Sequence, residues 1–167
     1  PIERLAGEGR EGRYRFPRPM LQELDRDGPN RYAFSFSGLK TAVLLAVRAS
    51  QDLSGDAPHI ARAFQDALIE TLVTKTIRAA SAFSRRRIVL GGGVACNGAL
   101  QNAMRERAKA LGAAVFAPSP RLATDNAAMI ARAGLFHLER GERSGYDMSA
   151  FASMPLPGSL DLAAVAR

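Results

Sequence analysis

The sequence predicts an α/β fold built from parallel strand-helix units and long helices. Residues 87–140 have the pattern strand, turn, helix, strand, turn, helix, and residues 56–83 have the apolar spacing of one long helix. A strand-helix-strand unit of this length is a right-handed crossover between parallel strands. Both strands then end at the same edge of the sheet, which is where open α/β sheets bind their ligands.

The composition limits the class of protein. The chain of 167 residues, 47% of them hydrophobic, is long enough for one domain with one core. No apolar run approaches the roughly 20 residues that cross a bilayer, and no leader opens the chain, so we expect a soluble, cytoplasmic protein with no membrane partner. The single cysteine excludes a disulfide framework. The net charge of +7 suits a polyanion such as nucleic acid, although a basic charge by itself more often reflects only solubility.

The two ends of the chain are expected to be irregular. Residues 1–33 are rich in glycine, proline and arginine, which predicts an irregular arm, although residues 1–6 already have a helical pattern. That pattern lacks a cap, which indicates that further sequence precedes it. Residues 141–167 lose all periodicity and are expected to form an extended tail. The core of the domain is therefore expected within residues 34–140.

Two helices are expected at the start of this core. Ser37 can cap a helix over residues 38–49. Its inward-facing residues are expected to be Leu39, Val43, Leu44 and Val47. Asp56 and Pro58 are typical of the start of the long helix that runs to residue 83. The apolar stripe of that helix is expected to be Ile60, Phe64, Leu68 and Leu72.

Three consecutive glycines form the first candidate site. Gly91, Gly92 and Gly93 follow a buried strand over residues 88–90 and precede a helix whose expected N-cap is Asn97. Glycines allow a sharp turn and the close approach of a ligand, and the free N–H groups at a helix start favour negative charge. The arrangement suits a nucleotide, but it lacks the spacing of known phosphate loops, so a simple capped turn explains it equally well.

The second strand-helix unit adds a carboxylate to the same edge. A strand is expected over residues 113–117 and a helix from residues 124–126 to about residue 140. Parallel pairing would bring Asn97 and Asp125 to one rim. A carboxylate in the first turn of a helix stays ionised and is available to a metal or cationic group. A plain capping role for Asp125 is the more common alternative.

Four motifs together resemble the TsaD/Gcp family, formerly called O-sialoglycoprotein endopeptidase. They are residues 34–41 (Phe-Ser-Phe-Ser-Gly-Leu-Lys-Thr), 61–66 (Ala-Arg-Ala-Phe-Gln-Asp), 91–97 (Gly-Gly-Gly-Val-Ala-Cys-Asn) and 124–131 (Thr-Asp-Asn-Ala-Ala-Met-Ile-Ala). The resemblance implies the actin-like ATPase fold of sugar kinases and heat-shock ATPases, of which residues 1–167 would form the C-terminal lobe. It also implies an enzyme that transfers the threonylcarbamoyl group of threonylcarbamoyl-AMP to the adenosine beside the tRNA anticodon.

The resemblance also implies roles for individual residues. Gly91, Gly92, Gly93 and Asn97 match positions that contact the nucleotide. With less support, Glu3 matches an acidic position that contacts the nucleotide ribose in some members of the family. The adenylate would therefore bind along the glycine turn.

One metal ligand is implied in the same way. Asp125 matches a ligand of a divalent metal ion, iron or zinc, which two histidines of a His-x-x-x-His motif absent from this chain would complete. The implied partners are tRNA, threonylcarbamoyl-AMP and other proteins of the threonylcarbamoyladenosine pathway. With one ligand of three, the isolated chain is expected to be inactive, and an unpaired sheet edge is expected to make it dimerise.

Three other functions remain open from the sequence. A metalloprotease, as the older family name suggests, needs metal-binding histidines, and the chain has no His-Glu-x-x-His helix. A kinase or chaperone ATPase of the same superfamily is disfavoured by the motifs at residues 34–41 and 124–131. A non-catalytic nucleotide-binding or scaffolding module is consistent with the chain by itself.

Overall fold

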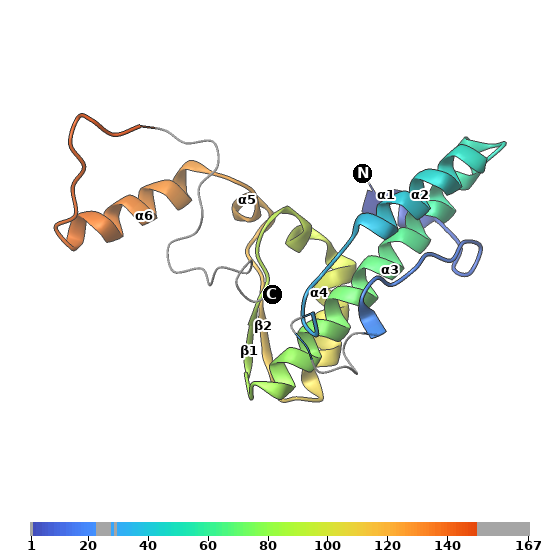
Figure 1. Ribbon diagram of the computed structural model, residues 1–167, viewed down its shortest axis with the longest axis horizontal. Coiled ribbons are helices and arrows are strands. Elements are labelled where there is room, and N and C mark those ends of the chain that lie inside the picture. Colours follow the sequence, from blue (N-terminus) through green and yellow to red (C-terminus); the bar gives the residue numbers. More distant parts are fainter. Residues whose placement is uncertain (1, 23–27, 29, 150–167) are drawn as a thin grey trace.

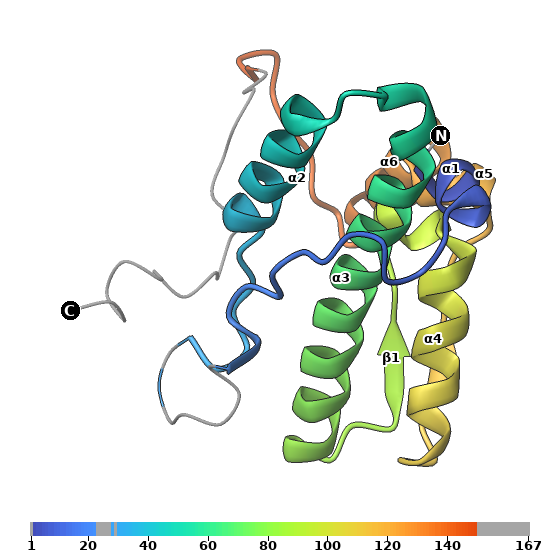
Figure 2. The ribbon, with the colours of Figure 1, turned by 90° about the vertical axis from the view of Figure 1, so that its right-hand side faces the viewer.

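The computed structural model describes residues 2–22, 28 and 30–149. The elements are α1 (Ile2–Glu8), α2 (Ser37–Ala49), α3 (Leu53–Ala82), β1 (Arg87–Val89), the 3-10 turn η2 (Gly93–Cys96), α4 (Gly98–Lys109), β2 (Ala114–Phe116), α5 (Pro120–Ala123) and α6 (Ala127–Glu139). The long helix α3 runs between α2 on one side and β1 with α4 on the other (Figure 2). Most of the predicted tail lies outside the described residues.

The parallel strand-helix-strand unit is confirmed. β1 pairs with β2 in parallel, with Ile88 opposite Val115 and Val89 opposite Phe116, and α4 makes the crossover. β1 has the predicted length of three residues but begins one residue earlier, at Arg87, whereas β2 is shorter than predicted. Leu90 continues the ladder because its N–H donates to the Phe116 carbonyl at 2.8 Å. Among the described residues the sheet has only these two strands. The fold is therefore α/β and mostly helical.

The helix α3 contributes to two separate apolar clusters. One lies between α3, β1 and α4, and its buried residues are Val73, Ala80, Ile88, Leu100, Met104 and Ala108. The other lies between α3, α2 and the N-terminal arm, and its buried residues are Phe16, Leu39, Ile60, Ala63 and Ala67. A single predicted stripe could not describe a helix that is covered on two sides.

Both early helices begin earlier than predicted. Ser37 is the first residue of α2 rather than its cap, and Phe36, in the cap position, makes no side-chain hydrogen bond there. Leu44, predicted to face inward, is 45% exposed. Asp52 caps α3 by accepting a hydrogen bond from the Gly55 N–H at 3.1 Å, so Asp56 lies inside the first turn and does not mark its start.

The N-terminal arm is less irregular than predicted, because residues 2–8 form α1 and the residues after it are fastened to α3. Gly9 lies so close to α3 that an added Cβ would overlap the Pro58 carbonyl oxygen, and the Arg10 N–H donates to His59 Nδ1 at 2.9 Å. Arg13 pairs with Asp56 at 2.9 Å. Hydrogen bonds to Asp56, above all from Ser50, hold the pKa of this carboxyl below its usual value.

A buried lysine holds the next segment against α3. Lys75 is almost completely buried, and its Nζ donates to the Ala33 carbonyl at 2.6 Å and lies 5.8 Å from the centre of the Phe34 ring. Burial of an ammonium group is favourable only when such acceptors surround it. Lys75 therefore links the segment before α2 to the middle of α3.

The helix α6 is exposed on all sides. The helix predicted from residues 124–126 to about residue 140 is confirmed as α6, which begins after its cap Asn126, whereas the short helix α5, which ends at Ala123, was not predicted. No residue of α6 is buried among the described residues, and the helix extends away from the other elements (Figure 1). Its exposed apolar side chains are Met129, Ile130, Leu135, Phe136 and Leu138. None of the described helices is long and apolar enough to cross a membrane.

The exposed sheet predicts self-association of the chain. Val89 and Phe116 lie opposite each other and are 75% and 51% exposed, and each strand has an edge that no described residue pairs. We expect the purified chain to dimerise, and Val89→Lys to weaken the dimer because charge on an edge strand opposes pairing. Light scattering coupled to size exclusion measures this.

The matched control for this prediction adds the same charge elsewhere. Asn102 is exposed on α4, so Asn102→Lys should leave the dimer unchanged. A strictly monomeric chain at high concentration, or equal association of both variants, would show that the sheet is not the contact.

Candidate nucleotide site

An apolar hollow lies where α1, α3 and η2 meet. Its volume is about 510 Å³. The residues that line it are Ile2, Glu3, Phe64, Gln65, Leu68, Gly93, Val94, Cys96 and Asn97. Three of the residues predicted to contact a nucleotide, Glu3, Gly93 and Asn97, are therefore together at one hollow. They come from two elements about 90 residues apart in the chain.

Asn97 connects the glycine turn to α3. As predicted, it caps α4, because its Oδ1 accepts a hydrogen bond from the Leu100 N–H at 2.8 Å. Its Nδ2 donates to Gln65 Oε1, also at 2.8 Å. The cap fixes which end of the Asn97 amide is oxygen, so the nitrogen must face Gln65. The two hydrogen bonds hold the start of α4 at a set place beside α3.

Glu3 holds the start of α4 from the other side. Its Oε1 accepts a hydrogen bond from the Gly98 N–H at 2.8 Å. The N-terminus of a helix attracts negative charge, so this carboxylate is favourably placed. Because Glu3 already occupies the free N–H of Gly98, an anionic group of a ligand would not bind at that N–H. The carboxylate instead offers its other oxygen to hydroxyl groups.

The three glycines do not line the same hollow. Gly93 lines the apolar hollow, whereas Gly91 and Gly92 line a second one of about 390 Å³ between the ends of β1 and β2. Gly92 has φ +81° and ψ 173°, a conformation that only glycine adopts readily. The prediction that all three glycines contact one ligand therefore holds only for a ligand that extends across the turn.

The structure corrects the expected place of Asp125. Asn126, not Asp125, caps α6, because Asn126 Oδ1 accepts from the Met129 N–H at 3.1 Å, and Asp125 lies before the helix rather than in its first turn. Asp125 is exposed and does not line the apolar hollow. Its neighbour Thr124 does approach the glycine turn, since a Cβ added to Gly93 would lie 3.9 Å from Thr124 Cγ2.

The described residues do not form a complete metal site. They contain no group of three or more histidine, cysteine, aspartate or glutamate side chains close enough to hold an ion. Asp125 is a single exposed oxygen donor with no hydrogen bond to another described residue. It fits one ligand position of a divalent metal, and the other ligands would have to come from outside the described part of the chain.

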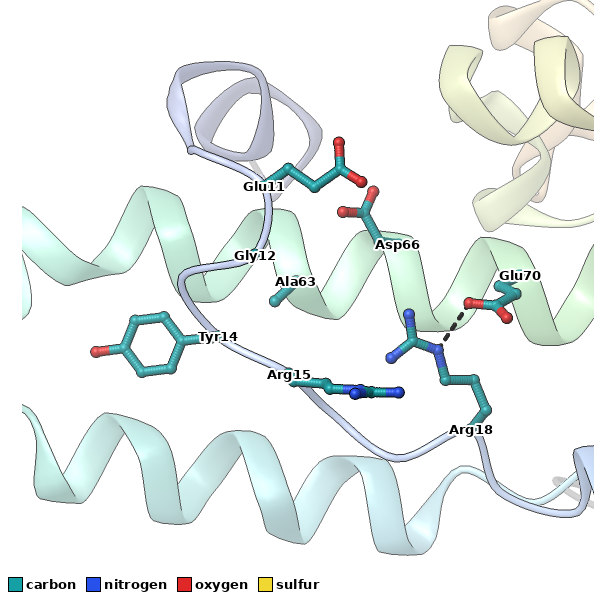
Figure 3. Close-up of a pocket in the computed structure, with 8 residues that line it drawn as sticks. All are labelled: Glu11, Gly12, Tyr14, Arg15, Arg18, Ala63, Asp66 and Glu70. Carbon is teal, nitrogen blue, oxygen red and sulfur yellow. Dashed lines mark hydrogen bonds and ion pairs between the residues drawn. The ribbon is translucent and has the colours of Figure 1, made fainter.

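A second large hollow is lined by charged groups that neutralise one another. Figure 3 shows it between the arm and α3, lined by Glu11, Gly12, Tyr14, Arg15, Arg18, Ala63, Asp66 and Glu70. Arg18 pairs with Glu70 at 2.8 Å (Figure 3), and Arg62 bonds both Asp66, at 2.9 Å, and Glu11, at 3.3 Å. The pairs of Arg18 with Glu70 and of Arg62 with Glu11 fasten the arm to α3, so this charged hollow is a weaker candidate for a nucleotide site than the apolar hollow.

Sequence reasoning assigned no role to Gln65, although it named the motif that contains it. The residue is polar within an otherwise apolar stretch, Ala63-Phe64-Gln65, and this was the available signal. Gln65 and Asn97 are far apart in the sequence, so their contact could not be predicted without knowing how η2 packs on α3. The role of Arg18 in holding the arm was missed for the same reason.

Comparison with known proteins decides the family. The family model described as tRNA N6-adenosine threonylcarbamoyltransferase (TsaD) matches residues 1–132, which is most of the chain and includes every residue of the apolar hollow. The chain belongs to the TsaD family. The resemblance inferred from the four motifs is therefore confirmed.

Several relatives carry the same name. The tRNA N6-adenosine threonylcarbamoyltransferase of Gemmatimonas aurantiaca is 54% identical over 97% of this chain and 48% of its own length. Those of Syntrophotalea carbinolica and Geobacter sulfurreducens are each 44% identical over 93% of this chain and 44% of their own length. The chain thus spans about half the length of the curated TsaD relatives it matches.

The conformation of the glycine turn can be tested through stability. Gly92→Ala should lower the free energy of unfolding by about 1–3 kcal/mol, because alanine is strained at this φ and ψ. Gly91→Ala should change it by less than about 1 kcal/mol, because nothing lies within 4 Å of the added Cβ and its φ is not in the left-handed region. Urea denaturation followed by circular dichroism measures both; equal effects would contradict the geometry of the turn.

Proposed function

We propose that this chain is the part of a tRNA N6-adenosine threonylcarbamoyltransferase that binds the adenosine portion of threonylcarbamoyl-AMP. The observation that carries the proposal is the apolar hollow, which unites Glu3, Gly93 and Asn97 within the segment that matches the TsaD family. The activity belongs to a protein of family length, that is, a protein as long as the TsaD relatives, which are about twice as long as this chain.

The chemistry of the hollow suits a nucleoside. Ile2, Phe64 and Leu68 provide apolar walls for a flat base. Glu3 can accept a hydrogen bond from a ribose hydroxyl, as acidic residues do in other nucleotide sites. Its negative charge would repel a phosphate, so the phosphate and its threonylcarbamoyl group should lie away from Glu3, along the turn that contains Gly92.

The proposed reaction is the transfer of the threonylcarbamoyl group from threonylcarbamoyl-AMP, in which this group and the phosphate form a mixed anhydride. The exocyclic amine of the tRNA adenosine attacks the carbamoyl carbon, the new C–N bond forms, the C–O bond to the phosphate breaks, the amine loses a proton and AMP leaves. Holding the adenylate rigidly at the turn lowers the entropic cost of this step. Neither Cys96 nor a serine is needed as nucleophile.

We further propose that Asp125 is one ligand of a divalent metal ion, iron or zinc. Such an ion would polarise the carbonyl of the anhydride when bound. Thr124, which borders Gly93, would place the loop of Asp125 beside the phosphate end of the adenylate. The remaining ligands would come from residues other than those described.

The partners follow from this reaction. The substrates would be tRNA and threonylcarbamoyl-AMP, and the net charge of +7 favours a polyanion such as tRNA. We propose an actin-like lobe for the fold, a cytoplasmic location and assembly with other proteins of the pathway. A metalloprotease is not favoured, because the relatives are named as transferases.

The proposal predicts that Asn97→Ser weakens binding of AMP. Serine still caps α4 but lacks the amide that bonds Gln65 and faces the hollow. In a protein of family length that carries this chain, we expect the Kd for AMP to rise about tenfold, and tRNA modification to fall with it. Calorimetry and an assay of threonylcarbamoyl transfer measure the two effects.

The control for this prediction is Asp52→Ser, which alters the cap of α3 far from the hollow and should leave both readouts unchanged. The isolated chain is expected to give no transfer. Undiminished AMP affinity in a folded Asn97→Ser variant would reduce Asn97 to a helix cap. Transfer by the isolated chain would contradict the dependence on a second lobe.

The metal proposal predicts that Asp125→Asn lowers metal affinity at least about tenfold, the loss that even an outer-shell substitution causes. Stability should change by less than about 0.5 kcal/mol, since Asp125 makes no hydrogen bond with another described residue. The metal content of a family-length protein that carries this chain, determined after dialysis, measures the effect, and Glu139→Gln on the exposed helix α6 is the control. Full metal content in Asp125→Asn would exclude Asp125 as a ligand.

A further inference from the structure

Gln65 is a buried polar residue that the proposed reaction does not yet use. It lies on α3, is only 8% exposed, and lines the apolar hollow between Phe64 and Asn97. Burying an amide costs free energy unless its donors and acceptors are paired. The position of Gln65 therefore calls for a partner at both ends of its side-chain amide.

One end of this amide has a partner and the other does not. The Leu100 N–H fixes Oδ1 of Asn97, so Nδ2 of Asn97 must donate, and the atom that accepts from it must be Oε1 of Gln65. Nε2 of Gln65 is left with no hydrogen-bond partner among the described residues. Nε2 is not sealed from solvent either, since no described buried side-chain atom is unsatisfied.

We propose that Gln65 determines the base specificity of this hollow, by donating a hydrogen bond from Nε2 to an acceptor nitrogen of a purine ring. The inference rests on the proposed function, because it takes an adenylate as the ligand. Side-chain amides bond ring nitrogens of adenine elsewhere in recognition of nucleic acids. Apolar walls around a single oriented donor strengthen such a bond and reject bases that lack an acceptor there.

The experiment compares AMP with its 1-deaza, 3-deaza and 7-deaza analogues, each of which lacks one ring nitrogen. In a protein of family length that carries this chain, calorimetry should show that one analogue binds about threefold to tenfold more weakly than AMP, the size of one hydrogen bond. In Gln65→Glu that difference should vanish, because glutamate still accepts from Asn97 but has no donor. Gln65→Met should behave likewise if folded.

The control is Gln101→Met, because the Gln101 amide donates to the Ala95 carbonyl near the turn but does not line the hollow. Gln101→Met should keep the preference of the wild type for AMP over the weakly bound analogue. Equal affinity of the wild type for AMP and for all three analogues would overturn the role of Gln65. A Gln65→Glu variant that still binds AMP more tightly than the same analogue would also overturn it. Failure of the wild type to bind AMP would overturn the proposed function instead.

Discussion

The hydrogen bond between Asn97 Nδ2 and Gln65 Oε1 is the contact on which the proposed site depends. It ties the strand-turn-helix unit to the middle of α3, and α3 in turn holds α1 and its Glu3. The same Asn97 side chain caps α4, so the orientation of its amide also fixes the orientation of the Gln65 amide in the hollow. Loss of either residue would leave the apolar walls in place but remove the order of the donors and acceptors.

The apolar packing of α3 makes this contact possible. One cluster binds α3 to β1 and α4, and the other binds it to α2 and the arm, so the helix is held from both sides. Side chains placed by a packed scaffold bind ligands with little loss of conformational entropy. The outer face of the sheet, with Val89 and Phe116, and the helix α6 have no comparable support among the described residues, which agrees with a chain that spans about half the length of its relatives.

Local patterns in the sequence were sufficient for the strands, the glycine turn and the Asn97 cap, because each depends on neighbouring residues. The partner of Asn97 and the place of Glu3 depend on the packing of α1 and α3 against the turn, and no periodicity reports such a contact. Asp125 was expected in a first turn, but Asn126 competes for the same cap and accepts from Met129. The glycine, proline and arginine content of the arm predicts irregular structure, and its anchors to α3, Gly9 and Arg18, follow no periodicity that would reveal them.

The most direct test of the account is the location of AMP on the protein. A crystal structure of a family-length protein carrying this chain, grown with AMP, should show the base in the apolar hollow between Phe64 and Asn97, with the ribose beside Glu3. The phosphate should lie toward Gly92. AMP found instead in the charged hollow beside Arg15 and Arg18 would contradict the account.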